Sequence, residues 1–278
     1  MFITTYVLVN IILDLKGDDL IEYSRIISNS YRCGEMMTEA QIAEAAKKLE
    51  PEKAEAVLRW AVESFLRVGF ASSFGAEDVA VIDLLSKIDA KKKVVLFTLD
   101  TGRLPEETYQ LMDQIREKYG VSVKSYFPDK WAVEKLEQEK GFYSFRQSVE
   151  NRKECCGIRK VEPLSRALSG LGAWITGLRR EQAVTRTGLP KVETDTAHNN
   201  IAKINPIADW THAQLWEYIK EHKVPYNKLH DQNFPSIGCS PCTRAVKPGE
   251  DIRSGRWWWE LPEHKECGLH VKPGPKKA

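Results

Sequence analysis

Hydrophobic and polar positions alternate between two periods along the middle of the chain. Short apolar runs typical of strands are followed by stretches in which apolar residues recur at helical spacing. The predicted strands cover residues 70–74, 94–99, 121–127, 173–176 and 203–207, and the predicted helices cover roughly 39–67, 78–87, 105–119, 131–140 and 211–222. Residues 94–99 form a continuous apolar run of the kind that buried parallel strands have. This order predicts an α/β fold with a mainly parallel sheet.

The two ends of the chain do not follow this alternation. The first 35 residues are apolar and β-branched and then acidic, without the early positive charge and small-residue cleavage site of a secretory signal. Thr38-x-x-Gln41 reads as a capping box directly after Met36-Met37. We therefore expect residues 1–37 to be a non-native or disordered leader, the alternative being a genuine N-terminal element. Beyond about Val224 the chain is loop-like, so the expected division is a folded domain at 38–243 and a C-terminal segment at 244–278.

Composition and charge exclude several classes of protein. The 278 residues are 42% hydrophobic and 29% charged, which is ordinary for a globular protein and excludes wholesale disorder. No apolar run reaches the roughly 18 residues of a membrane-spanning helix. A net charge of +2 is too balanced for a protein that coats nucleic acid. Residues 152–191 nevertheless hold nine Lys or Arg against three Glu, which predicts either a compact anionic ligand or a solvated basic face.

Two loops at the ends of predicted strands carry candidate chemistry. Ser72-Ser73-Phe74-Gly75-Ala76-Glu77-Asp78 joins a strand to a helix, and Asp100-Thr101-Gly102-Arg103 follows the next strand. Backbone N–H groups at a helix start attract phosphate, although the first loop is not a Walker A loop because it lacks GK[ST]. For either loop alone, an ordinary strand–helix turn is the better explanation than a ligand site. Because open parallel sheets bind ligands at the carboxyl ends of their strands, the two together predict a nucleotide cleft.

Four of the six cysteines form two pairs, Cys155-Cys156 and Cys239-Ser-Pro-Cys242. Four thiolates suit either a tetrahedral zinc ion or an iron–sulfur cluster. Adjacent cysteines make a poor zinc knuckle, because successive side chains diverge, whereas divergent thiolates reach two corners of a larger cubane. We therefore expect a [4Fe-4S] cluster, the alternatives being zinc, four unliganded thiols or two disulfides.

Cys267 stands alone near the end of the chain, in Lys265-Glu-Cys-Gly-Leu-His270. The basic neighbours Lys265 and His270 favour its thiolate, and a tail segment is accessible to a partner. Cys267 is therefore the candidate nucleophile, the alternative being an inert core cysteine. Cys33, in the leader, has no such context.

Seven motifs resemble one enzyme family over about residues 40–271. They are Ser73-Phe-Gly-Ala-Glu-Asp78, Asp100-Thr-Gly-Arg103, Cys155-Cys-Gly-Ile-Arg-Lys160, Thr176-Gly-Leu-Arg-Arg-Glu-Gln182, Ile237-Gly-Cys-Ser-Pro-Cys-Thr-Arg244, Gly255-Arg-Trp-Trp-Trp259 and Lys265-Glu-Cys-Gly-Leu-His270. In these motifs the chain resembles the assimilatory adenylyl-sulfate reductases of the phosphoadenylyl-sulfate reductase family. The resemblance implies an adenine-nucleotide α-hydrolase-like, mainly parallel sheet with helices on both faces and a loop-rich C-terminal tail.

The resemblance also implies an activity and its parts. A cytoplasmic homo-oligomer would reduce adenosine 5′-phosphosulfate to sulfite and AMP in assimilatory sulfate reduction, with no nucleic-acid or membrane partner. The Cys267 thiolate would form an S-sulfonate that thioredoxin resolves, beside a [4Fe-4S] cluster on Cys155, Cys156, Cys239 and Cys242. The substrate-binding residues implied are Ser72, Ser73, Phe74, Gly75, Asp100, Thr101, Gly102, Lys160, Arg186, Arg253, Arg256 and His270.

Three other functions remain open from the sequence. One is the same reduction of the 3′-phosphorylated substrate, or of both substrates. The second is a tRNA-thiolating enzyme, which would require SGGxDS where this chain has SSFGAED at 72–78. The third is a zinc-ribbon module that binds a nucleotide or nucleic acid without catalysis.

Overall fold

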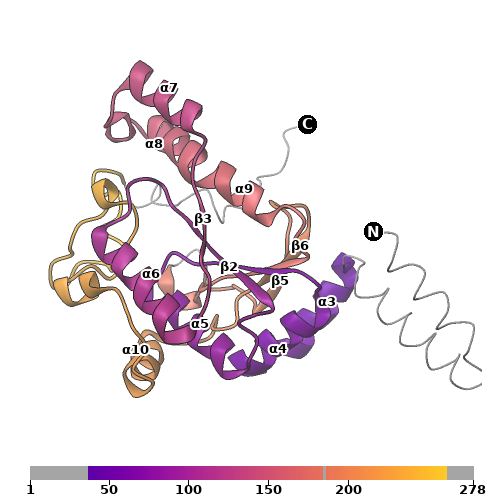
Figure 1. The fold of residues 1–278 in the computed structure, drawn as a ribbon. Helices are drawn as coiled ribbons and strands as arrows, with labels where there is room; N and C mark the ends of the chain where they lie inside the picture. Colours follow the sequence, from indigo (N-terminus) through magenta and orange to yellow (C-terminus); the bar gives the residue numbers. More distant parts are fainter. Residues whose placement is uncertain (1–36, 184–185, 262–278) are drawn as a thin grey trace, which may run out of the picture.

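A six-stranded sheet forms the centre of the computed structural model, which describes residues 37–183 and 186–261 (Figure 1). The strands are β1 (Val68–Ala71), β2 (Val94–Leu99), β3 (Lys124–Tyr126), β4 (Ala173–Ile175), β5 (Val192–Asp195) and β6 (Ile201–Ile204). Their order is β3-β2-β1-β4-β6-β5, with all neighbours parallel except the antiparallel edge pair β5–β6. The predicted α/β fold with a mainly parallel sheet is confirmed.

Helices connect the strands and cover the sheet. They are α3 (Glu39–Leu49), α4 (Ala54–Ser64), α5 (Ala76–Lys87), α6 (Glu106–Tyr119), α7 (Lys130–Lys140), α8 (Val149–Cys156), α9 (Glu162–Leu168) and α10 (His212–Glu221). The capping boxes at Thr38 and Thr211 are both present, so the starts of α3 and α10 are fixed by local chemistry. The single helix predicted over 39–67 is two helices, because Pro51 interrupts the run.

Both faces of the sheet are buried, because successive strand residues point to opposite sides. Phe70 of β1 and Ile175 of β4 enter one core, which α3, α4, α5, α6 and α10 cover. Phe97 of β2 and Trp174 of β4 enter a second core with α9 on the other side of the sheet (Figure 1). Helices on both faces were expected, and this arrangement leaves the carboxyl ends of the strands as the open edge.

Several boundaries differ from those that the pattern predicts. The strand predicted at 70–74 is β1, which ends at Ala71, and the strand predicted at 203–207 is β6, which ends at Ile204. The edge strand β5 and the helices α8 and α9 were not predicted. The expected leader lies almost entirely outside the described residues. Within the described ranges, no helix is long and apolar enough to cross a membrane.

Candidate active site

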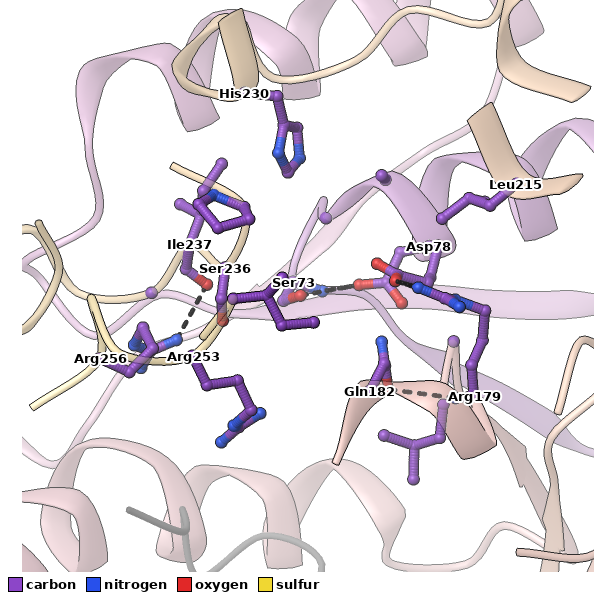
Figure 2. A pocket seen from close by; sticks show the side chains of 18 of the residues that line it. Ser73, Asp78, Arg179, Gln182, Leu215, His230, Ser236, Ile237, Arg253 and Arg256 are labelled. Atoms are coloured by element: carbon purple, nitrogen blue, oxygen red, sulfur yellow. Dashed lines mark hydrogen bonds and ion pairs between the residues drawn. The ribbon is translucent and has the colours of Figure 1, made fainter. Parts of the chain in front are cut away.

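A cavity of about 710 Å³ opens at the carboxyl ends of β1, β2 and β4. Its walls come from the loop after β1, the segment after β4, the helix α10 and the loops between residues 230 and 257. Figure 2 shows Arg253 and Arg256 on one side of this space and Arg179 and Gln182 on the other. The position agrees with the rule that parallel sheets bind ligands beyond their strand ends.

The loop that follows β1 is held in shape by its own side chains. The Asp78 carboxylate accepts hydrogen bonds from the backbone N–H of Ser73 at 2.6 Å and from the Ser73 hydroxyl at 2.8 Å. Phe74 has a left-handed φ of 58°, and its N–H donates to the Ser72 hydroxyl at 3.1 Å. Burial raises the pKa of Asp78 to about 6, against the hydrogen bonds from Ser73, which favour the charged form.

A second loop, after β4, locks against the first. The Arg179 guanidinium, 1% exposed, donates two hydrogen bonds to Glu77 Oε1 at 2.8 and 3.1 Å. A Cβ atom at Gly177 would lie 2.3 Å from Asp78 Oδ1, so only glycine permits this approach. The two loops therefore form one rigid wall of the cavity.

The opposite wall is cationic. Lys160, Arg253 and Arg256 line it, whereas Arg186 lines the cavity from the other side, where it donates to Gln182 Oε1 at 2.6 Å. All four are residues that the sequence predicts to bind a compact anion. Arg256 is buried, donates to the Ile237 carbonyl at 3.1 Å and lies over the Trp257 ring at 4.6 Å. A Cβ atom at Gly238 would lie 2.3 to 2.5 Å from three guanidinium atoms of Arg256. The glycine therefore leaves the space that the arginine occupies.

The remaining predicted binding residues divide into three groups. Ser72, Ser73 and Gly75 line the cavity. Phe74 has no exposed surface and packs in the core, while Asp100, Thr101 and Gly102 lie outside the cavity lining. Asp100 accepts from Gly102 N–H and Tyr109 O–H, both at 2.9 Å, and burial together with this carboxylate raises the pKa of Tyr109 to about 12. Cys267 and His270 fall outside the described residues, so their roles stay predictions.

The two cysteine pairs meet beside the cavity although about 80 residues separate them in sequence. Cys155 and Cys156 end α8, directly before a π-helical turn at Gly157–Val161. Cys239 directly precedes the 3-10 turn Ser240–Cys242, and Cys242 is its last residue. All four are thiols, and they line one small cavity. The backbone N–H of Ser240 donates to the Arg103 carbonyl at 2.8 Å, which ties the second pair to the loop after β2.

The surroundings of the thiols are unusually cationic for a buried site. Five basic side chains line the same small cavity: Arg103, Arg152, Arg159, Lys160 and Arg256. The Thr101 hydroxyl lies 3.2 Å from Cys239 Sγ. Burial raises the pKa of the Cys242 thiol to about 12 and also raises that of Cys155, which Arg159 and Arg103 partly oppose. Burial therefore disfavours thiolates at this site unless a positive charge beyond that of the five basic side chains compensates them.

The donor set fits an iron–sulfur cluster. Two buried N–H groups of the small cavity, Arg159 Nε and Trp257 Nε1, find no hydrogen-bond acceptor in the part of the chain that the structure describes. Cluster sulfurs and thiolates would supply such acceptors, and the cations would offset their charge. No three His, Cys, Asp or Glu side chains within 37–183 and 186–261 converge on a site for a single metal ion.

Three side chains line both the large cavity and the small one: Lys160, Arg256 and Trp257. A ligand at the thiols would thus set the position of two cations that face the larger space. Sequence reasoning missed other lining residues, among them Arg179 and Asp78, which lie within the quoted motifs, and His230, for which the sequence offers no signal.

Comparison with known proteins gives consistent matches. The family model described as phosphoadenosine phosphosulfate reductase domain matches residues 67–245. The chain is 51% identical to an adenosine 5′-phosphosulfate reductase of Burkholderia cepacia, over 79% of this chain and 87% of that protein. It is 44% identical to the enzyme of the same name from Pseudomonas aeruginosa, over 81% and 85%. The crystal structure of phosphoadenylyl-sulfate reductase from Candida auris, a phosphate complex, matches with a TM-score of 0.64 and 30% identity, over 77% of this chain and all of that one.

Proposed function

Because the chain belongs to the phosphoadenosine phosphosulfate reductase family, we propose that it reduces adenosine 5′-phosphosulfate to sulfite and AMP. The family resemblance seen in the seven sequence motifs is confirmed. The observation that carries the proposal is the cavity at the strand ends, which is lined by the cationic side chains of Lys160, Arg186, Arg253 and Arg256 and by the Ser73–Asp78 loop. A nucleoside carrying a compact anion fits both walls.

The reaction proposed at Cys267 has two steps. Its thiolate attacks the sulfur of the phosphosulfate, a sulfur–sulfur bond forms, and the bond from sulfur to the phosphate oxygen breaks. AMP leaves with that electron pair, and Cys267 carries an S-sulfonate. A thiolate of reduced thioredoxin then attacks Cys267 Sγ, sulfite leaves with the bonding pair, and the second thioredoxin thiol completes a disulfide that releases Cys267.

The cationic wall serves the first of these steps. Negative charge grows on the bridging phosphate oxygen as the sulfur–oxygen bond breaks, and positioned cations stabilise it without reorganisation. Arg256 is held in place by its bond to Ile237 and by the Gly238 backbone, so it is preorganised for this role. Lys160 and Arg253 line the same wall.

We also propose that Cys155, Cys156, Cys239 and Cys242 hold a [4Fe-4S] cluster. When bound, the cluster supplies a fixed electrostatic field and a scaffold rather than an electron path, since thioredoxin provides both electrons. Lys160, in the π-helical turn that follows Cys156, is then oriented toward the substrate from the same segment. We also propose a cytoplasmic location, where thioredoxin is kept reduced. A homo-oligomeric state stays a prediction.

Anaerobic turnover with reduced thioredoxin tests the proposal. The full chain is assayed with adenosine 5′-phosphosulfate and, in parallel, with its 3′-phosphorylated form. We expect kcat/KM to favour the first by at least about tenfold, because an additional phosphate dianion requires its own donors and desolvation. No sulfite from either compound contradicts the proposal. Equal kcat/KM values would make the enzyme one of dual specificity.

Elemental analysis tests the cluster separately. We expect iron and acid-labile sulfide in a one-to-one ratio, about four of each per chain. Stoichiometric zinc without sulfide would contradict the cluster. A Cys156→Ser variant should lose iron, whereas Cys33→Ser should keep it, because Cys33 lies in no pair.

A further inference from the structure

His230 points into the large cavity from the wall above the Ser73–Asp78 loop (Figure 2). It belongs to the short 3-10 helix Lys228–Gln232, which caps the cavity between α10 and the cysteine segment. Its ring packs edge-on against Trp216, with 5.2 Å between the ring centroids, and against Tyr226 at 6.5 Å. These contacts fix the ring plane and leave one edge directed at the cavity.

The two ring nitrogens of His230 have different environments. One nitrogen forms a hydrogen bond with the backbone of Phe234, whose own N–H donates to the Leu229 carbonyl at 3.1 Å. Nε2 is buried and has no hydrogen-bond partner among residues 37–183 and 186–261. The bond to Phe234 therefore comes from Nδ1, and Nδ1 carries the hydrogen that the Phe234 carbonyl accepts.

The imidazole is neutral at physiological pH. Burial lowers the pKa of His230, and the nearby Glu77 and Asp231 only partly oppose this effect. With the proton on Nδ1, the neutral ring presents the lone pair of Nε2 to the cavity. A buried acceptor without a partner is costly and is rare in folded proteins, so such an atom in a cavity marks the place of a ligand donor.

We infer that His230 Nε2 accepts a hydrogen bond from an O–H or N–H group of the nucleoside part of the bound nucleotide, either a ribose hydroxyl or the adenine amino group. This inference rests on the proposed function, because it requires an adenine nucleotide in the cavity. A phosphate or sulfate oxygen is excluded as the partner, since it is itself an acceptor and would be repelled by the Nε2 lone pair. The phosphosulfate belongs instead to the wall that carries Arg253 and Arg256.

The inference makes His230 a residue that determines specificity. If its partner is the ribose 3′-hydroxyl, phosphorylation of that hydroxyl removes the donor and places an anion against a neutral acceptor. If its partner is the adenine amino group, His230 instead distinguishes adenine from bases with a carbonyl at that position.

Binding of the product AMP and its analogues tests the inference. Dissociation constants are measured by anaerobic calorimetry for the full chain with AMP, 2′-deoxy-AMP, 3′-deoxy-AMP and inosine 5′-monophosphate. The variants are His230→Asn, which retains a donor near the Phe234 carbonyl but removes the acceptor, and His230→Gln, which can place a carbonyl oxygen near the position of Nε2. His222→Asn is the control, because His222 does not line the cavity.

We expect His230→Asn to raise the dissociation constant for AMP by about tenfold, which is the effect of losing one hydrogen bond. It should leave unchanged the affinity for the one analogue that lacks the partner group, and that analogue identifies the group. His230→Gln should restore part of the AMP affinity, and His222→Asn should match the wild-type chain. Equal weakening of AMP and all three analogues would show a structural role only and overturn the inference, as would unchanged AMP affinity in His230→Asn. A wild-type chain that does not bind AMP contradicts the proposed function itself, and the inference with it.

Discussion

The carboxylate of Asp78 accepts both the backbone N–H and the hydroxyl of Ser73, at 2.6 and 2.8 Å. The loop after β1 therefore satisfies the Ser73 amide from within, two residues before Gly75, the N-cap of α5. An anion placed there would have to displace a buried carboxylate. We therefore propose that the phosphosulfate binds the basic side chains that line the cavity and that the Ser73–Asp78 loop faces the nucleoside.

Asp78 makes stability depend on pH. Its pKa is about 6 in the folded chain against an ordinary value of 3.8, so between these values the folded chain retains a proton that the unfolded chain has lost. The free energy of unfolding must then decrease as pH rises, by about 1.4 kcal/mol per pH unit from this group. The free energy of unfolding of Asp78→Asn, taken relative to that of the wild type, should therefore rise by about 1.4 kcal/mol from pH 5 to 6. It should rise little more above pH 7.

Chemical denaturation of both chains at several pH values measures this difference. Asp113→Asn, which changes an exposed carboxylate on α6, is the control. If the unfolding free energies of wild type and Asp78→Asn change in parallel across pH 5 to 7, Asp78 does not titrate as described.

Gly238→Ala should displace Arg256 without unfolding the chain. The new methyl group would overlap the guanidinium, whose position over the Gly238 backbone depends on the missing Cβ. We expect KM for adenosine 5′-phosphosulfate to rise by about tenfold or more, because charge-assisted hydrogen bonds contribute about 1.5–3 kcal/mol. Gly188→Ala is the matched control, since among residues 37–183 and 186–261 no atom beyond its chain neighbours lies within 4 Å of the added Cβ there. An unchanged KM in Gly238→Ala would remove Arg256 from the substrate-binding wall.

Glu260→Gln should destabilise the fold through a buried ion pair. Arg152 and Glu260, with side chains 1% and 3% exposed, join α8 to the end of the described chain through two hydrogen bonds of 2.9 Å. Removal of the Glu260 charge deprives the buried Arg152 guanidinium of its carboxylate partner, at a cost of about 3–5 kcal/mol. The melting temperature should fall by about 6 °C or more, as followed by circular dichroism. Glu44→Gln, which breaks an exposed pair with Lys48, should not change it measurably. Equal melting temperatures for the two variants would contradict this account.

The sequence predicts the parts of this fold that are determined locally. β2 is found to the residue because its apolar run is continuous, and the starts of α3 and α10 follow from capping boxes. The strand β5 was not predicted, because it is short and polar. In the folded chain its Glu193 forms an ion pair of 3.2 Å with Lys203 of β6. Such pairing joins residues that a local pattern cannot relate.

The segment from α8 to α9 was missed for the same physical reason. Some of its buried residues are arginines. A prediction from the hydrophobic pattern places every charged residue at the surface, so it does not recognise these positions as buried. Arg152 and Arg159 are buried because Glu260 and Glu137, far away in the sequence, pair with them. Only the assembled fold brings these partners together.

The site shows a similar division. The basic residues and cysteines were found because they lie in motifs, and the structure brings the cations to one cavity. Phe74 and Asp100 were selected for their place in loops, yet their side chains point into the fold. His230 gave no signal, because its place in the cavity wall arises only when α10, its own turn and the loop after β1 come together.

The most direct test of the central claim is the adduct on Cys267. The wild-type chain and Cys267→Ser are incubated anaerobically with adenosine 5′-phosphosulfate without thioredoxin, and the intact proteins and their peptides are weighed by mass spectrometry. A thiol ionises far more readily than a serine hydroxyl, so we expect one SO₃ group on the Cys267 peptide of the wild type, released as sulfite when thioredoxin is added. Cys267→Ser should bind AMP like the wild type, yet form no adduct and release no sulfite. Sulfite release by Cys267→Ser at a rate near that of the wild type would contradict the proposed mechanism.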